Sequence, residues 1–250
     1  MKFNRLTGNI GAEVFDFQLC EISDSSFSEV AELLWEHQVL VFRRQEMTAS
    51  DHVALGRRFG ELHWHPNFPG IDEHPEVLAI SNWGKDKTIT EVWHSDVSCD
   101  DEPPSVSILR AIHLPSYGGD TMWSNQYAAW DSLSESMQRM IAPLRAVHEN
   151  YDIRSSHPVA RTHPETGRKA LYVNDGFTRH FEGMSVAESR PLLRYLVDVG
   201  SSLDLTMRHS WQPGDVVMWD NRCVMHFAIH DYGDAQRDMH RVTVRGEKPV

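Results

Sequence analysis

Three residues in two distant segments have side chains of the types that hold a non-haem iron ion. His94 and Asp96 form an H-x-D pair near the middle of the chain, and His226 lies close to its end. Two imidazoles and one carboxylate form the ligand set that binds Fe(II) and leaves coordination positions open. Arg237 and Arg241 follow in a strand-like segment, and a guanidinium pairs well with a carboxylate. Together these residues predict an oxygenase that holds an acidic co-substrate beside iron.

The spacing within the H-x-D pair has a geometric reason. On a strand, side chains at positions i and i+2 lie on the same face and start about 6.6 Å apart. Both can then converge on one ion about 2 Å from each ligand atom. We therefore expect the segment from His94 to Asp96 to be extended, with the third ligand on another strand.

Two histidines in the C-terminal segment are candidates for the third ligand, His226 and His230. Their i, i+4 spacing would suit a zinc site on a helix, but the surrounding residues favour an extended stretch. On a strand the two side chains start about 13 Å apart, so only one can join the site. His226 is favoured because it follows the apolar run at 223–225. His230 adjoins a turn and is expected to face solvent.

Simpler interpretations exist for these residues taken one at a time. An H-x-D pair by itself is more often a polar pair on the surface. His63 and His65 form a rival H-x-H pair, which is more simply a pocket-wall or surface pair than a metal site. The combination of the H-x-D pair with His226 and the two arginines is what favours the metal centre.

Composition and charge exclude several classes of function. The 250 residues are 40% hydrophobic and 24% charged, as in an ordinary globular protein. The net charge of −12 argues against a nucleic-acid partner, and no apolar run approaches the ~20 residues that span a membrane. The N-terminus lacks the apolar segment of a signal peptide. Cys20, Cys99 and Cys223 are odd in number and widely spaced, which is typical of free thiols in the cytoplasm. The expected partner is a small molecule, and a homo-oligomer is compatible with the pattern.

Capping boxes and apolar residues at helical spacing predict four helices. They begin at the box 26–29, at Thr48, near Ser134 and at the box 185–188, and the second and fourth end near Gly60 and Gly200. Pro191 falls in the second turn of the fourth helix, where it removes one backbone hydrogen bond.

The rest of the chain is predicted to form short strands separated by turns. The strands are marked by apolar and β-branched runs at 39–42, 77–80, 105–109, 170–173, 215–219 and 241–244. Many short strands without a β-α-β rhythm favour an antiparallel sandwich or jelly roll with helices packed outside. The predicted fold class is mainly β with flanking helices, in a single domain that spans residues 1–250.

The order of the motifs resembles the taurine dioxygenase/2,4-dichlorophenoxyacetate dioxygenase family of Fe(II)- and 2-oxoglutarate-dependent oxygenases. The resemblance covers nearly the whole chain. It rests on the blocks W-H-S-D-V at 93–97, L-P-S-Y-G-G-D-T at 114–121, R-T-H-P at 161–164, Y-V-N at 172–174, W-D-N-R at 219–222 and R-D-M-H-R at 237–241. It implies a double-stranded β-helix, a cupin-like jelly roll, in agreement with the strand-rich pattern.

The same resemblance implies roles for individual residues. It implies that His94, Asp96 and His226 bind iron, and that Thr121 and Arg237 hold the distal carboxylate of 2-oxoglutarate. A guanidinium pairs bidentately with a carboxylate and a hydroxyl adds one hydrogen bond, so these residue types suit the role. Without the resemblance, Thr121 would pass for an ordinary strand threonine.

The resemblance also implies a substrate pocket. Relatives similar to taurine dioxygenase hold the anionic group of the substrate with the arginine four positions after the clamp, which is Arg241 here. His65 and Phe68 fall where the family lines its pocket, and Phe68 replaces a tyrosine and so lacks a hydroxyl donor. Val97 and Phe177 are further candidates for the pocket wall, although Phe177 is also a plausible core aromatic.

Two features depart from the family pattern. The segment between His148 and Arg161 is shorter than the lid-like insertion that relatives usually carry, which predicts a more open or differently closed pocket. Glu91 precedes the metal motif, and a carboxylate there would disfavour an anionic substrate if it faced the pocket.

The implied reaction is hydroxylation of a small anionic molecule, coupled to conversion of 2-oxoglutarate and O2 to succinate and CO2. A sulfonate, a sulfate ester, an aryloxyalkanoate or an amino-acid-like compound would fit. Asp96 favours hydroxylation over halogenation, because related halogenases lack this carboxylate. Desaturation or oxidative rearrangement, a non-catalytic sensor of 2-oxoglutarate or metal, and a zinc-dependent hydrolase or isomerase remain as alternatives.

Overall fold

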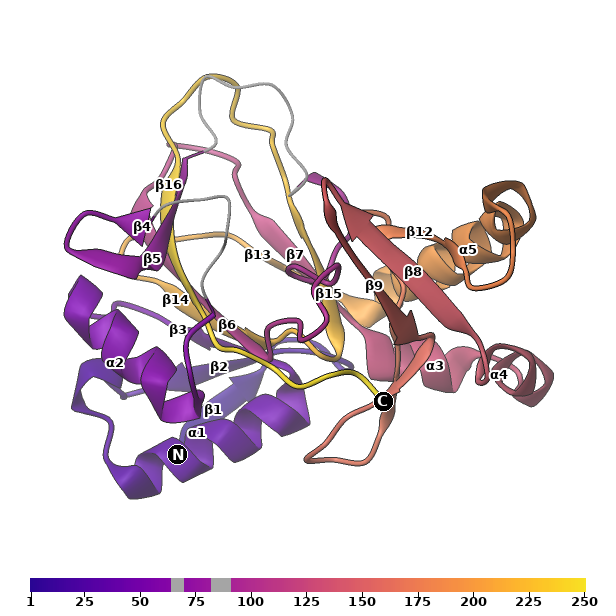
Figure 1. Ribbon diagram of the computed structural model, residues 1–250. Coiled ribbons are helices and arrows are strands. Elements are labelled where there is room, and N and C mark those ends of the chain that lie inside the picture. Colours follow the sequence, from indigo (N-terminus) through magenta and orange to yellow (C-terminus); the bar gives the residue numbers. More distant parts are fainter. Residues whose placement is uncertain (64–69, 82–90) are drawn as a thin grey trace.

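The computed structural model describes residues 1–63, 70–81 and 91–250, and the largest element among them is an eight-stranded sheet (Figure 1). Its strands are, in order, β1 (Lys2–Arg5), β2 (Ala12–Phe15), β3 (Val39–Phe42), β14 (Val216–Asp220), β6 (Val106–His113), β16 (Asp238–Thr243), β5 (His74–Ser81) and β4 (Gly70–Ile71). Neighbouring strands pair antiparallel except β2 with β3, which run parallel. Most neighbours in the sheet come from distant parts of the chain, as expected when a sheet is wound into a jelly roll.

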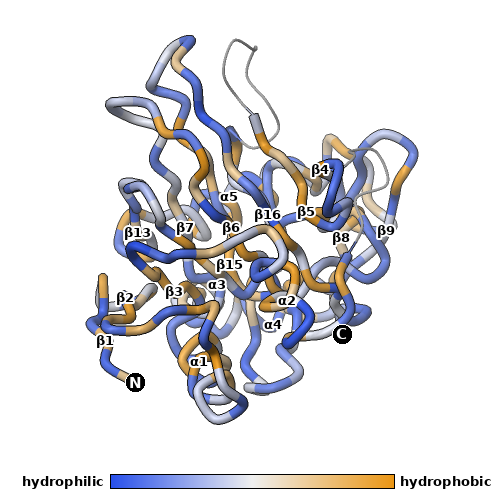
Figure 2. The backbone as a smooth tube through the Cα atoms, turned by 90° about the vertical axis from the view of Figure 1, so that its left-hand side faces the viewer, coloured by the Kyte–Doolittle hydropathy of each residue, from blue (hydrophilic) through white to orange (hydrophobic). Residues whose placement is uncertain are grey.

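A second, three-stranded sheet within the described residues packs against the first. It consists of β13 (Thr206–His209), β7 (Thr121–Asn125) and β15 (Val224–Ala228). The layer between the two sheets contains buried residues of both, such as Val217 and Leu109 from the large sheet and Trp123 and Val224 from the small one. Figure 2 shows hydrophobic residues gathered along the central strands β3 and β6. This pair of sheets is the predicted double-stranded β-helix.

The outer face of the large sheet is covered by α1 (Asp24–His37) and α2 (Ala49–Phe59) (Figure 1). Leu34 of α1 and Leu55 of α2 belong to the same buried cluster as Met218 of β14. Val217, the residue before Met218, points to the inter-sheet layer instead, because side chains alternate between the two faces of a strand. The run at 216–219 therefore needs apolar residues at every position, since both faces of this strand are buried.

The segment between β7 and β13 forms a third layer around its own buried cluster. It consists of α3 (Gln126–Ser132), α4 (Glu135–Ile141), β8 (Arg145–Asn150), β9 (Ile153–Pro158), β10 (Ala160–Thr162), β11 (Lys169–Leu171), β12 (Thr178–Phe181) and α5 (Val186–Gly200). Single 3₁₀ turns occur at Leu19–Glu21 and Leu203–Leu205. In Figure 1 this layer lies on the opposite side of the molecule from α1 and α2.

The helix boundaries follow the capping residues. Thr48 and Ser185 cap α2 and α5 as predicted, each in a reciprocal box with the residue three positions later, and Ser134 caps α4. The predicted start of the first helix was wrong by one turn. Its N-cap is Ser23, which forms the box with Ser26, so Ser26 ends the box instead of opening it.

No helix in the described parts of the chain is both long and apolar enough to cross a membrane.

Candidate active site

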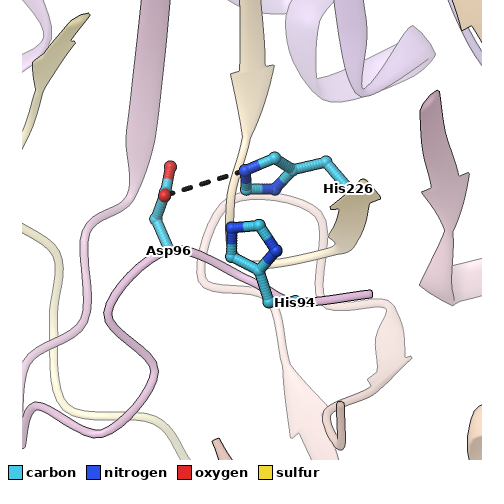
Figure 3. A group of neighbouring side chains, drawn as sticks. All are labelled: His94, Asp96 and His226. Carbon is cyan, nitrogen blue, oxygen red and sulfur yellow. Dashed lines mark ion pairs between the residues drawn. The ribbon is translucent and has the colours of Figure 1, made fainter. Parts of the chain in front are cut away.

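The structure brings His94, Asp96 and His226 together at one point between the two sheets (Figure 3). All three are buried, and their ligand atoms lie within 4.8 Å of one another. Nε2 of His226 lies 3.7 Å from Oδ1 of Asp96, and the two imidazole centroids are 4.0 Å apart. Two donors that each lie about 2 Å from one ion are roughly 3 to 4 Å apart. The three side chains can therefore surround a single ion.

His94 is extended as predicted, but Asp96 is not on a strand. His94 forms an isolated antiparallel bridge with His226 of β15, in which the N–H of each residue donates to the carbonyl of the other at 3.0 and 2.7 Å. The chain then turns, and Asp96 lies in this turn. Val97 has a φ of +46°, which a strand does not allow. Asp96 therefore approaches the histidines from a turn, and the predicted strand spacing is wrong beyond His94.

Asn221, in the connection between β14 and β15, holds the backbone of this turn. Its side-chain oxygen accepts from the N–H of Asp96 at 2.7 Å. Its amide donates to the carbonyls of Asp96 at 3.0 Å and of Pro104 at 2.9 Å. A β-branched residue with positive φ, such as Val97, persists only where the surroundings over-determine its conformation. The hydrogen bonds of Asn221 contribute to that constraint.

Replacing Asn221 by alanine is expected to destabilise the fold by about 3 kcal/mol or more, because each buried polar group that loses its hydrogen bond costs about 1–3 kcal/mol. Denaturant unfolding measures this loss. Asn9→Ala is the matched control, since Asn9 is exposed and its side-chain amide donates to the carbonyl of Asp204 at 2.7 Å. This control should cost under about 1 kcal/mol. Equal losses for the two variants would contradict the role assigned to Asn221.

The two carboxylate oxygens of Asp96 have different partners. Ser107 donates to Oδ2 at 2.7 Å, and Nη1 of Arg241 donates to Oδ1. Burial by itself would raise the pKa of Asp96, but Arg241, followed by His226 and His94, outweighs it and holds the pKa well below its usual range. Asp96 is therefore ionised at neutral pH, the form that binds a metal.

The two histidines are held in the neutral form. Burial lowers the pKa of His94, and burial together with neighbouring His94 lowers the pKa of His226 well below its ordinary value. Nδ1 of His94 lies 2.8 Å from the carbonyl of Val92, which leaves Nε2 free for a metal. Nδ1 of His226 is buried without a hydrogen-bond partner among the described residues. Two neutral imidazoles and one carboxylate make a donor set that fits Fe(II).

A cavity of about 380 Å³, counting its open mouth, adjoins His226. Its described lining combines an apolar wall of Ile80, Leu109, Trp219, Ala228 and Met239 with the polar residues Thr121, His226, Arg237 and Arg241. Arg241 and Met239 lie on the same face of β16, because residues two apart on a strand share a face, and Arg237 reaches the same cavity from just before the strand. The side chain of Arg241 therefore faces the cavity.

Thr121 and Arg237 reach the cavity from opposite sheets. Thr121 begins β7 and is 2% exposed, and Arg237 directly precedes β16 and is 3% exposed. Nε of Arg237 donates to the carbonyl of Gly119 at 3.0 Å. Burial lowers the pKa of Arg237, but a guanidinium stays protonated in proteins. The remaining N–H groups of Arg237 are thus available to an anion in the cavity.

The turn at Gly118-Gly119 packs against the side chain of Arg237. Both glycines have positive φ, +69° and +72°, a region that residues with a Cβ rarely adopt. A Cβ on Gly119 would also lie 3.1 Å from Cδ of Arg237. Oδ1 of Asp231 accepts the N–H of Gly119 at 2.8 Å. The two glycines therefore let the backbone of this turn approach the arginine closely.

The predicted wall residues are placed as follows. His65 and Phe68 lie outside the described residues. Val97 and Phe177 pack in one buried cluster, and the Phe177 ring is 6.3 Å from that of His94. Neither residue is part of the described lining of the cavity, so their roles in substrate binding stay predictions. His63, of the rival H-x-H pair, lies 3.2 Å from Asp100.

The expected exposure of His230 is wrong. Its Nδ1 lies 3.0 Å from Oε1 of Glu91, and its ring stacks on that of Tyr232 with centroids 4.5 Å apart. Its side chain is 14% exposed. Glu91 is buried in this pair and is not part of the described cavity lining. The carboxylate of Glu91 therefore does not face the described part of the cavity, where it would have repelled an anionic substrate.

The short segment between His148 and Arg161 forms a tight hairpin. β8 and β9 pair up to Asn150 and Ile153, so Tyr151 and Asp152 alone make the turn. Tyr151 has a φ of +50° and is 80% exposed. This stretch is therefore a hairpin of sheet and turn, and its predicted effect on how the pocket closes stays a prediction.

A second group of possible ligands, His163, Asp220 and Cys223, also lies within 4.8 Å. Arg222 engages both oxygens of Asp220, from Nε at 2.9 Å and from Nη2 at 2.7 Å, and His163 lies 2.8 Å from Oδ2. Burial raises the pKa of the Cys223 thiol well above its ordinary value, and a protonated thiol is a poor metal ligand. The group is satisfied within the protein and serves as a structural network.

Sequence reasoning missed the residues that hold the site in place. Ser107 donates to the carboxylate of Asp96, the side chain of Asn221 bonds twice to the backbone of Asp96, and Trp211 donates to Thr121. Their partners are distant in the chain, and no local pattern marks them.

Comparison with known proteins agrees with this arrangement. The model of the Taurine catabolism dioxygenase TauD, TfdA family matches residues 2–243. An alkylsulfatase of Acinetobacter baylyi is 33% identical over 99% of this chain and 86% of its own length. An alpha-ketoglutarate-dependent sulfate ester dioxygenase of Pseudomonas putida is 33% identical over 98% of this chain and 89% of its own. The crystal structure of a taurine dioxygenase from Burkholderia xenovorans superposes with a TM-score of 0.92 at 35% identity, covering 100% and 90% of the two chains.

The chain belongs to the TauD/TfdA family. It is an oxidoreductase, an Fe(II)- and 2-oxoglutarate-dependent dioxygenase that uses O2. The jelly-roll fold and the reaction class predicted from the sequence are both confirmed.

Proposed function

We propose that His94, Asp96 and His226 bind the iron, that Thr121 and Arg237 hold the distal carboxylate of 2-oxoglutarate, and that Arg241 binds an anionic group of the substrate. The whole chain would act as one catalytic domain. The free cysteines are typical of a reducing compartment, which supports a cytoplasmic location.

The observation that carries this proposal is that two buried guanidinium groups line one cavity together with His226, a member of the ligand triad. Counting only the described residues around the cavity, two guanidinium groups and a divalent ion would bring four positive charges, and Asp96 and 2-oxoglutarate would bring three negative ones. One positive charge is left over. An uncompensated charge in a cavity with apolar walls is unfavourable, so the site favours a substrate with a single negative charge.

The substrate class follows from the shape and charge of the cavity and from the relatives. The cavity must hold the co-substrate beside the substrate, and its described lining is a short apolar wall with a few polar side chains, which favours a small molecule as substrate. Relatives named as an alkylsulfatase and a sulfate ester dioxygenase favour a monoanionic alkyl sulfate ester over a sulfonate or an aryloxyalkanoate. Hydroxylation of the carbon that bears the ester oxygen would give a hemiacetal-like product. That product collapses to an aldehyde and releases sulfate.

The residues of the chain have separate tasks in this reaction. Bound iron supplies the oxidation of the substrate C–H bond with O2 and 2-oxoglutarate. Arg237 and Thr121 orient the co-substrate, and Arg241 anchors the anionic end of the substrate and fixes which C–H bond faces the metal. Ile80, Leu109 and Met239 keep water from the reacting carbon.

The test is succinate formation by the Fe(II)-loaded protein with 2-oxoglutarate, O2 and a panel of alkyl sulfates, sulfonates, aryloxyalkanoates and amino acids. We expect an alkyl sulfate to stimulate succinate formation, with one sulfate released per succinate. Stimulation by another class would overturn the assignment of the substrate. If no compound stimulates succinate formation although iron is bound, a non-catalytic sensor would become the better interpretation.

Arg241→Met is expected to raise the KM for the anionic substrate about tenfold to a hundredfold, because a hydrogen bond to a charged group is worth about 1.5–3 kcal/mol. The affinity for 2-oxoglutarate should change far less. Arg110→Met is the control, since Arg110 pairs across strands with His240 and so lies on the opposite face of the sheet from Arg241. An unchanged substrate KM in Arg241→Met would remove Arg241 from the binding site.

A further inference from the structure

We propose that Trp211 is a positioning residue that fixes the hydroxyl of Thr121 as a hydrogen-bond donor toward the co-substrate. The site would then select an oxo acid whose far end accepts hydrogen bonds and donates none. This inference rests on the proposed clamp of Thr121 and Arg237.

The direction of one hydrogen bond carries the argument. Nε1 of Trp211 lies 3.0 Å from Oγ1 of Thr121, and both residues are buried. An indole N–H can only donate, so the threonine oxygen must accept. The single proton of the hydroxyl is then left to donate elsewhere. No other hydrogen bond of this hydroxyl is found among the described residues, and Thr121 lines the cavity. The hydroxyl proton of Thr121 therefore points into the cavity, where it can be donated to a ligand.

The indole of Trp211 is fixed by the residues packed against its ring. Its ring stands at 90° to that of His209, with centroids 4.8 Å apart. Nε2 of His209 lies 3.0 Å from Oδ2 of the buried Asp215, which also accepts the N–H of Gln212 at 2.8 Å and bonds to Arg43 at 2.6 Å. This chain of contacts fixes the connection between β13 and β14 on which Trp211 lies. The indole N–H is therefore aimed by the fold and is not free to turn away.

One end of the cavity therefore offers hydrogen-bond donors from both sides, from Arg237 and from Thr121. The guanidinium of Arg237 has no acceptor atom, and the bond to Trp211 commits Thr121 to donating as well. A carboxylate satisfies such a site with all its lone pairs. A carboxamide brings two N–H groups that would face donors, and a site built from fixed hydrogen-bonding groups discriminates strongly against a mismatched ligand. Without Trp211, the Thr121 hydroxyl could rotate and accept from an amide.

The experiment measures binding, not turnover. N-oxalylglycine, in which an N–H replaces one methylene of 2-oxoglutarate, and its glycinamide counterpart are titrated into the Mn(II)-loaded protein by calorimetry. The parent protein should bind the acid much more tightly than the amide. Trp211→Phe keeps an aromatic ring and removes the N–H. We expect it to weaken binding of the acid about fivefold, as for an ordinary hydrogen bond, with little loss for the amide, so that the acid-to-amide ratio falls.

Trp123→Phe is the matched control. Trp123 is a buried tryptophan of the same aromatic cluster, 6.3 Å from the Trp211 ring, and its Nε1 has no hydrogen-bond partner among the described residues. It should lose stability as Trp211→Phe does and keep the acid-to-amide ratio of the parent. A purely structural effect of Trp211 would weaken both ligands equally in both variants, and this outcome would overturn the inference.

A double-mutant cycle separates this inference from the clamp on which it rests. Thr121→Val should weaken binding of the acid, and Trp211→Phe should add less than about twofold in that background, because Trp211 acts through the threonine. If Thr121→Val leaves the affinity unchanged, the proposed clamp itself fails. If Thr121→Val weakens binding and Trp211→Phe leaves the ratio intact, only the role of Trp211 is lost.

Discussion

His226→Gln is expected to abolish both metal retention and turnover. The site would lose one of the three buried ligand atoms that lie within 4.8 Å of one another. The remaining two, from His94 and Asp96, cannot surround an ion on three sides. Loss of an outer-shell partner of a metal ligand costs about 10–100-fold in affinity or activity, so loss of the ligand itself should exceed that, at about a thousandfold or more. Metal content after gel filtration and succinate formation measure the two effects.

His230→Gln provides the control for this prediction. His230 is the other histidine that the sequence offered as a ligand, and the structure pairs it with Glu91 at 3.0 Å instead. This variant should retain the metal even if the pairing with Glu91 is weakened. The assignment of His226 would be refuted by the reverse pattern, with the metal lost in His230→Gln and kept in His226→Gln.

Arg237→Met is expected to raise the KM for 2-oxoglutarate about a hundredfold or more. The substitution removes the charge-assisted hydrogen bonds of a bidentate pair, each worth about 1.5–3 kcal/mol. It keeps an unbranched apolar stem in the space between Gly119 and Tyr232. Steady-state kinetics at saturating substrate and direct binding of 2-oxoglutarate to the metal-loaded protein without O2 both measure this effect.

The shape of the side chain can be separated from its charge. Arg237→Lys keeps the positive charge but loses the planar fork, so it should fall between the parent and Arg237→Met. Arg245→Met is the control for a general loss of positive charge, because Arg245 is half exposed and pairs with Glu102 on the surface. If Arg237→Met and Arg245→Met behave alike, 2-oxoglutarate is not held by Arg237.

Local signals in the sequence were sufficient for features that depend on neighbouring residues. The reciprocal boxes at Thr48 and Ser185 join residues three positions apart, so their partners are visible in the sequence. The same reasoning placed the first helix one turn too late, because Ser23 and Ser26 both match a cap and only the structure shows which one caps. Apolar runs likewise identified β3 and β14, whose residues are buried on both faces.

The candidate site was predictable as a set of residue types but not as a geometry. An iron site with an acidic co-substrate is indicated by the H-x-D pair, His226 and the two arginines, because few other functions need these side chains together. Strand spacing gave the wrong path for Asp96, which reaches its place through a turn held by Asn221. The turn next to His230 gave the wrong exposure for this residue, whose partner Glu91 lies far away in the chain.

Residue types and their local spacing were enough to predict the fold class, the chemistry of the ligands and the starts of α2, α4 and α5. Only the tertiary structure shows how Asp96 is oriented and how Trp211 orients Thr121. It also shows which of the two buried groups of possible ligands can bind a metal, because the group of His163, Asp220 and Cys223 is satisfied by Arg222 and other protein side chains. The physical reason is the range of the interactions. Capping and alternation act over a few residues and leave a pattern in the sequence. The hydrogen bonds of Asn221 and Trp211 join segments that are adjacent only after the two sheets have packed.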